Sequence, residues 1–499
     1  MRTVVNRRGR PTAERTAGAV VIAASVVSLM GVRVVACSGS TSTCSSDAAA
    51  PVYVSDAGDA MSAVISGDAG QKLWAFPQGG PPDPGPGAVY VTISGEANAI
   101  MGYPFPPDSY TADTYMVDGW EFQIEAYIVV IDKIVLWSDP NLSATNQSLH
   151  GPQVAHISGP FVVDLHKGGT IVGQGGYPEE ATALGVIWNQ NDRCGASFDP
   201  TVTYGFGFST IPAGPLPGYT GEVAGYNAYN VNLDESEAAD YAYMVAHGAS
   251  VYYRGHTVWR GDDPSNSKGP CVAGNAGPGP DAGLIHVDGG PEAGVRSYNA
   301  ADGGWYDFAV EPQAGMNFRF AFSTPTSYVN CVNYTMAGIG VGGESSPRGV
   351  QISSSASAIA QVTLHMDHPF WESLAEDSPV RWDQIAAQYV GVAPPADGGI
   401  IESHLEDFRG VPFQGFTDHQ GTPVPWRNCV PGTTYVSPGN GQMSFSTLGV
   451  PVNPHETDPS KALRDYYDYI RYSQSTQGHM NSQGLCFIDR QFPSPPGGS

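Results

Sequence analysis

The chain has 499 residues and a formal net charge of −25, although only 14% of its residues are charged. At roughly 100 to 200 residues per domain, this length predicts two or three folded units. The negative charge excludes nucleic acid as an expected partner, because an acidic surface repels phosphate backbones. The 62 glycines and 41 prolines favour a mainly β chain with many turns over a helical bundle.

The first 36 residues have the layout of an export signal. Five arginines between Arg2 and Arg15 precede a sixteen-residue, largely apolar run, Ala17–Val32, which is followed by Val34-Val35-Ala36-Cys37. A basic start, an apolar stretch and a small residue before the cleavage point are what such a signal needs. The apolar run is shorter than the roughly 20 residues that span a bilayer core, which disfavours the alternative of an uncleaved membrane anchor.

The sequence that ends in Cys37 resembles the lipobox of bacterial lipoproteins. This resemblance implies that residues 1–36 are a signal peptide, that Cys37 is lipidated, and that the chain is held at a membrane by its lipid. Ser38 then implies passage to the outer membrane or cell surface. The body of the chain is similar to uncharacterised exported bacterial lipoproteins, and that similarity implies no activity.

Composition separates the rest of the chain into a tether and three expected folded regions. Residues 37–87 are rich in Ser, Ala, Gly and Pro, and we expect a flexible tether there. Residues 88–232 are expected to form a β-sandwich-like module, and 233–368 a second β-rich module with a Gly- and Pro-rich surface loop at 261–294. Residues 369–499 are expected to form a smaller helical or mixed C-terminal region.

The first module contains a series of short predicted strands. Strict alternation of apolar and polar residues over Trp120–Tyr127 indicates a half-buried strand, and the continuous apolar run Ile128–Trp137 indicates a fully buried one. Four more are predicted at Ala88–Ile93, Phe161–Leu165, Ala183–Trp188 and Thr201–Phe208. Six short strands separated by turns are typical of a sandwich or a barrel.

Helices are predicted later in the chain. Asp234–His247 begins with acidic residues and is followed by Gly248, the usual signs of a helix start and end. In the C-terminal region, helical structure is predicted from Pro369, over Arg381–Tyr389, and from Asp458 onward with a buried stripe at Leu463, Tyr466, Tyr467 and Ile470.

Seven cysteines in an exported protein predict disulfides. With Cys37 lipidated and Cys44 in the tether, five remain in the folded body: Cys194, Cys271, Cys331, Cys429 and Cys486. Sequence alone leaves many pairings open. We single out a Cys429–Cys486 bond, because it would hold the loop around His479 rigidly.

The most concentrated group of metal-binding side chains is His365-Met366-Asp367-His368, at the junction of a predicted strand and helix. In an extended chain His365 and Asp367 point to one face, and a turn at Pro369 can bring His368 toward them. Imidazole and carboxylate donors suit zinc or copper. His479 is the first choice for a completing ligand, ahead of His404, His419 and His455. The competing interpretation is structural, with Asp367 or His368 capping the helix.

Motif searches find no nucleophile elbow, zinc-protease helix, phosphate-binding loop or dinucleotide fingerprint. The leading hypothesis is therefore a non-enzymatic, lipid-anchored envelope protein that binds a divalent metal. One alternative is an exported metal-dependent hydrolase in which the same cluster activates water. Another is a carbohydrate- or polymer-binding surface protein whose exposed tryptophans form a platform, drawn from Trp120, Trp137, Trp188, Trp259, Trp305, Trp371, Trp382 and Trp426.

Overall fold

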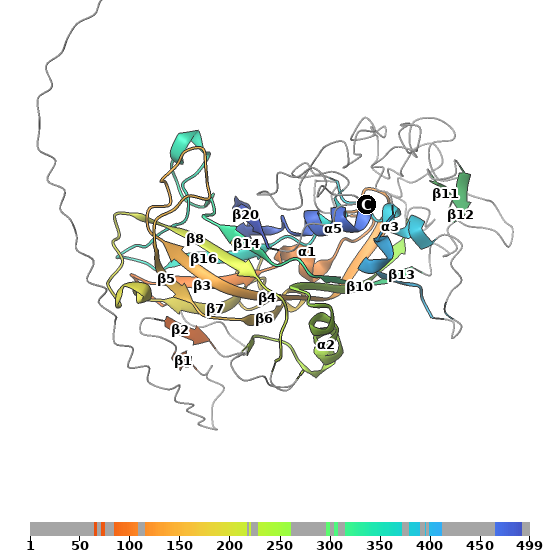
Figure 1. Cartoon of the computed structure of the whole chain (residues 1–499), viewed down its shortest axis with the longest axis horizontal. Helices are drawn as coiled ribbons and strands as arrows, with labels where there is room; N and C mark the ends of the chain where they lie inside the picture. The colour runs from red at the N-terminus through yellow and green to blue at the C-terminus, as the bar shows by residue number, and fades with distance from the viewer. Residues whose placement is uncertain are drawn as a thin grey trace, which may run out of the picture. The chain divides into compact units, whose positions relative to one another are not determined.

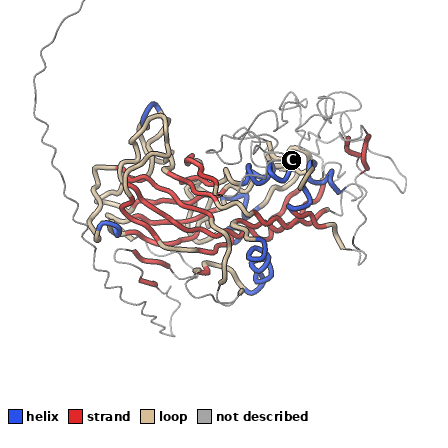
Figure 2. The backbone as a smooth tube through the Cα atoms, viewed as in Figure 1, coloured by secondary structure: helices blue, strands red, loops and turns tan. Residues whose placement is uncertain are grey.

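A computed structural model describes the chain in segments, all of which belong to one compact unit, Ala48–Ser499. The described residues are 64–66, 71–74, 84–107, 115–216, 219–220, 228–260, 296–299, 304–307, 315–371, 379–389, 395, 399–411 and 465–491. Strands dominate this part of the chain (Figure 2), which confirms the mainly β prediction. No helix within these segments is both long enough and apolar enough to cross a membrane.

Two large sheets make up the fold (Figure 1). The smaller sheet has the strand order β1-β2-β7-β3-β16-β18-β19. Its strands are β1 (Val64–Ser66), β2 (Gln71–Trp74), β3 (Val89–Ser94), β7 (Thr182–Ile187), β16 (Ala358–Leu364), β18 (Gly478–Met480) and β19 (Gly484–Leu485). Its centre is mixed, because β3 and β16 run parallel whereas β18 runs antiparallel to β16.

The larger sheet follows the path β17-β13-β10-β4-β8-β14-β20, with β5, β6, β9 and β15 paired to it at the side. Its path strands are β4 (Trp120–Trp137), β8 (Thr203–Thr210), β10 (Val251–Trp259), β13 (Met316–Phe322), β14 (Thr326–Val329), β17 (Glu402–His404) and β20 (Phe487–Arg490). The side strands are β5 (Gln153–Ile157), β6 (Phe161–Asp164), β9 (Tyr229–Asn230) and β15 (Val350–Gln351), and β11 (Arg296–Asn299) pairs separately with β12 (Gly304–Asp307).

The main hydrophobic core contains buried side chains from both sheets. Val91 and Val362 of the smaller sheet belong to the same cluster as Phe122, Phe206 and Phe320 of the larger one. Burial of this apolar surface between the sheets is the main favourable term in holding them together. This arrangement is sandwich-like, as the strand pattern predicts.

Strand β4 joins two predicted strands into one element of 18 residues. Its first part alternates between buried and exposed positions, as predicted for a half-buried strand. Its middle is buried on both faces: Val129 and Ile131 face the main core, whereas Ile128 and Val130 pack in a second cluster with Met244 of helix α2. The change from alternating to continuous apolar sequence therefore marks where a helix covers the outer face, and it does not mark a strand end.

The helices are α1 (Glu96–Met101), α2 (Ala238–His247), α3 (Asp383–Ala386) and α5 (Tyr466–Gln474). The predicted helix at 234–247 is confirmed: Asp234 and Glu237 form a capping box, and Gly248 ends α2 with a φ of 59°. Asp465 caps α5, where the predicted stripe of Tyr466, Tyr467 and Ile470 is buried. The predicted helix start at Asp458 lies outside the described residues.

Pairing between β4, β10 and β13 continues one sheet across position 232, so residues 88–232 and 233–368 share a core. The C-terminal region is mixed, and it adds strands to both sheets. Strands β1 and β2 fall within the segment assigned to the tether, and β2 pairs with β7, so this part of 37–87 belongs to the sheet. The signal segment 1–36 and the loop 261–294 lie outside the described residues.

The disulfide at Cys486 differs from the one predicted. Cys486 is bonded to Cys331, 155 residues earlier, and Cys429 lies outside the described residues. The predicted Cys429–Cys486 bond is therefore wrong, because Cys331 is the partner of Cys486. The reason is backbone pairing that the sequence does not reveal: the N–H of Val332 donates to the carbonyl of Leu485 at 2.8 Å, which places the two cysteines side by side.

Replacing both Cys331 and Cys486 by serine is expected to lower the free energy of unfolding by about 3–5 kcal/mol, because the bond closes a long loop in the unfolded chain. Denaturant unfolding followed by tryptophan fluorescence measures the difference. An unchanged midpoint in the double variant would contradict this bond.

Candidate metal centre

Three histidines from distant parts of the chain meet at the edge of the smaller sheet. His365 follows β16, His368 opens the short 3-10 turn His368–Phe370, and His479 is the middle residue of β18. One ligand atom from each of the three rings lies within 4.8 Å of the others. The rings of His365 and His479 are stacked, with centroids 4.2 Å apart. The cluster can therefore hold a metal ion.

Strand register explains the convergence. Thr363 of β16 pairs with Ser94 of β3 on one side and with His479 of β18 on the other. Side chains two residues apart on a strand share a face, so His365 lies diagonally across from His479. On the other side, Glu96 stands two residues beyond Ser94 at the start of α1.

Pro369 sets the position of His368. Proline is the second residue of the 3-10 turn His368–Phe370, near the start of the helical segment as predicted. The His368 residue is only 2% exposed. Trp371 stacks on the His368 ring with centroids 3.8 Å apart. The indole thereby covers one face of the His368 ring. The plane of that ring is nearly perpendicular to the planes of the His365 and His479 rings, and its centroid lies 5.5 Å from each of theirs.

Hydrogen bonds fix the proton positions on two of the rings. Nε2 of His365 lies 2.9 Å from the carbonyl of Ser482, which can only accept, so Nε2 carries a proton and Nδ1 is the nitrogen left to bind a metal. Thr476 Oγ1 donates to the carbonyl of Ser473 at 2.7 Å and so receives the Nδ1 proton of His368 at 2.6 Å. This leaves Nε2 of His368 with a lone pair, the arrangement usual in metal-binding histidines.

His479 contributes the least constrained ring. Neither of its nitrogens makes a hydrogen bond of standard geometry within the described residues, although the backbone of Gln483 approaches the ring. The side chain is only 5% exposed. A buried polar atom without a partner costs free energy, so both nitrogens call for a group that would satisfy them.

Electrostatics differ across the cluster. Burial lowers the pKa of both His368 and His479 well below the usual value, and the neighbouring imidazoles lower it further. Burial also lowers the pKa of His365, but the Glu96 carboxylate more than offsets this and raises it to about 9. Neutral imidazoles are the form that binds metal, so His365 must release a proton when a metal binds.

Glu96 is the residue near this cluster that sequence reasoning missed. Its carboxylate lies 3.5 Å from Nε2 of His365 and accepts a hydrogen bond from Ser482 Oγ at 2.6 Å. Burial raises the pKa of Glu96, but the charge and hydrogen bond of His365 reverse this and lower it to about 2. It lies 269 positions before His365 in the sequence, and only the parallel pairing of β3 with β16 brings the two together.

Asp367 is not part of the group of clustered donor atoms. Its carboxylate accepts a hydrogen bond from Nε1 of Trp371 at 2.8 Å, and burial raises its pKa. The predicted role as a ligand is thus replaced by one that orients the indole stacked on His368. The capping interpretation is also not observed, because Asp367 precedes the turn without a side-chain capping bond.

The other candidate residues lie elsewhere. His404 belongs to β17 and contacts Glu402 at 3.2 Å, whereas His419 and His455 lie outside the described residues. Of the tryptophans proposed as a sugar platform, four are buried: Trp120, Trp259, Trp371 and Trp382.

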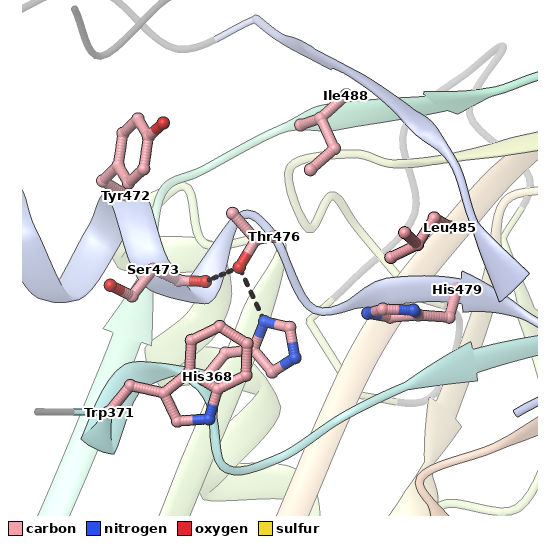
Figure 3. A pocket seen from close by; sticks show the side chains of 8 residues that line it. All are labelled: His368, Trp371, Tyr472, Ser473, Thr476, His479, Leu485 and Ile488. Carbon is pink, nitrogen blue, oxygen red and sulfur yellow. Dashed lines mark hydrogen bonds between the residues drawn. The ribbon is translucent and has the colours of Figure 1, made fainter. Parts of the chain in front are cut away.

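A cavity of about 160 Å³ adjoins the cluster on the side of His368 and His479 (Figure 3). Its wall is formed by those two histidines and by Trp371, Tyr472, Ser473, Thr476, Leu485 and Ile488. Three nitrogen ligands beside an empty volume are typical of metal sites that keep a coordination position open.

No protein-family model matches this chain, and neither the curated proteins nor the solved structures contain a match to it.

Proposed function

We propose that this protein is an exported, lipid-anchored envelope protein that binds one divalent transition metal, zinc or copper, through His365, His368 and His479. The observation that carries the proposal is the convergence of three imidazoles, two buried and one partly buried, with one ligand atom of each within 4.8 Å of the others. Imidazole binds zinc and copper well, and three such ligands make a sufficient protein shell for either.

The surrounding carboxylates favour binding over hydrolysis. A metal-dependent hydrolase needs a general base beside the metal-bound water. Both carboxylates next to the imidazoles are engaged, Asp367 by the indole of Trp371 and Glu96 by Ser482 and His365. Carboxylates held in this way can orient neighbouring side chains and balance the charge of a bound cation.

The location rests on the leader and on sulfur chemistry. Cys37, the proposed site of lipidation, lies outside the described residues. The Cys331–Cys486 bond supports export, because disulfides persist in oxidising compartments.

Metal analysis of the purified protein tests the binding site. Wild type is expected to retain one equivalent of zinc or copper after dialysis, whereas His365→Ala combined with His368→Ala, and separately His479→Ala, should fall to background. His247→Ala is the matched control, because that histidine ends α2 on the outer face of the larger sheet. Equal metal content in wild type and the cluster variants would rule out the site.

Metal should also stabilise the folded chain, because a ligand that binds only the folded state adds about 2.7 kcal/mol when its free concentration is 100 times Kd. Thermal unfolding of wild type with added zinc or copper is expected to shift upward, and unfolding of His479→Ala is not. A shift of the same size in both proteins would mean that the metal acts elsewhere.

Glu96→Gln is expected to weaken metal affinity by roughly 10- to 100-fold, the usual effect of losing a partner that orients a ligand. The amide keeps the size of the side chain but removes the negative charge next to His365. Competition with a chelator of known affinity measures the change. Glu121→Gln serves as control, because Glu121 pairs with Arg260 on the larger sheet, and an equal loss there would contradict a specific role for Glu96.

Cys37→Ser tests the anchor. The variant should move from the membrane fraction to the soluble fraction of expressing cells and lose incorporation of labelled fatty acid, because a serine cannot be acylated as a thiol is. Membrane association that survives the substitution would contradict lipid anchoring at Cys37.

A further inference from the structure

The cavity beside the histidine cluster has the dimensions of a small-molecule site. Its volume of about 160 Å³ is close to that of a buried cavity that accommodates benzene. Such a space is too large for a single metal-bound water to fill.

The wall of the cavity is mainly apolar. Trp371, Tyr472, Leu485 and Ile488 present most of its surface. None of the described residues that line it is acidic or is a lysine or arginine. Apolar surface of this kind favours an apolar or aromatic occupant, because binding removes that surface from water.

One polar group inside the wall has no partner. Ser473 is 1% exposed, and its Oγ makes no hydrogen bond within the described part of the chain. The backbone carbonyl of the same residue is already bonded to Thr476, which in turn holds His368 (Figure 3). The free hydroxyl therefore offers one hydrogen bond to an occupant that also reaches the metal side.

The cavity contacts His368 and His479 but not His365. Three ligands occupy one side of a tetrahedral ion, and the remaining position points away from them. An occupant of the cavity is thus placed to supply the fourth ligand, with its ring against Trp371 and its donor atom toward the metal.

We infer that this cavity binds an aromatic-ring-sized molecule that donates one nitrogen or oxygen atom to the metal and accepts a hydrogen bond from Ser473. The inference rests on the proposed metal site. It assigns to that site a ligand class, small heteroaromatic molecules, and it distinguishes the site from a closed structural one.

Cobalt-loaded protein tests the inference, because the visible spectrum of Co²⁺ reports a change of its ligands. Pyridine is expected to shift the spectrum with saturation, whereas benzene, which has the same ring size but no donor atom, should not. Leu485→Trp fills the cavity from a partly exposed position and should weaken pyridine binding about tenfold or more while cobalt uptake stays at one equivalent.

Pyrazine and pyridine form a matched pair that tests Ser473, since pyrazine carries a second acceptor nitrogen opposite the first. In Ser473→Ala the affinity for pyrazine relative to pyridine should fall roughly two- to tenfold, the effect of one hydrogen bond. An unchanged ratio would overturn the role given to Ser473.

The possible outcomes distinguish a failure of the cavity inference from a failure of the proposed metal site. Cobalt uptake without any response to pyridine, or a response unchanged by Leu485→Trp, would overturn the cavity inference and leave the metal site intact. Failure of wild type to take up cobalt, zinc or copper would overturn both.

Discussion

The register of β16 between β3 and β18 is the constraint on which the metal centre depends. One row of the sheet contains Ser94, Thr363 and His479. Because side chains alternate between the faces of a strand, the next position on the same face after Thr363 is that of His365. Glu96 lies two residues beyond Ser94, where β3 has ended and α1 begins. A shift of one residue in this register would turn His365 and His479 to opposite faces. The sheet thus places the carboxylate, one imidazole and its partner before any metal is considered.

Burial and charge give the side chains of the histidine cluster and Glu96 different roles. The chain as a whole is acidic, yet the cluster consists of three imidazoles, and Glu96 is the carboxylate that forms an ion pair with one of them. That carboxylate is on the outer side of His365, where it shares Nε2–H with the carbonyl of Ser482. Negative charge is therefore kept off the ligands themselves but near enough to favour a cation, as carboxylates that hydrogen-bond to metal-binding histidines do in other metal proteins.

The sequence predicted the secondary-structure elements better than the long-range contacts between them. The alternating and continuous apolar runs of β4, the capping residues of α2 and the histidines around Pro369 are local patterns, and local patterns can be read in one sequence. Glu96 and the bond between Cys331 and Cys486 depend on pairing between segments more than 150 residues apart. The ligand assignment failed at Asp367 for a similar reason, because the sequence gives no sign that Trp371 would turn its N–H toward that carboxylate.

The fold also bears on what kind of metal site this is. A structural ion is needed where the chain cannot otherwise bury enough apolar surface, as in small metal-dependent domains. Here the two sheets share an extensive core, and the disulfide joins β19 and β20 to the segment after β14 without help from an ion. The three imidazoles contribute little to that core, and the side toward Leu485 and Ile488 is hollow. An ion held there stabilises the chain only by its own binding free energy, so the cost of burying three imidazoles is explained better by a metal that meets a ligand than by a metal that holds the fold together.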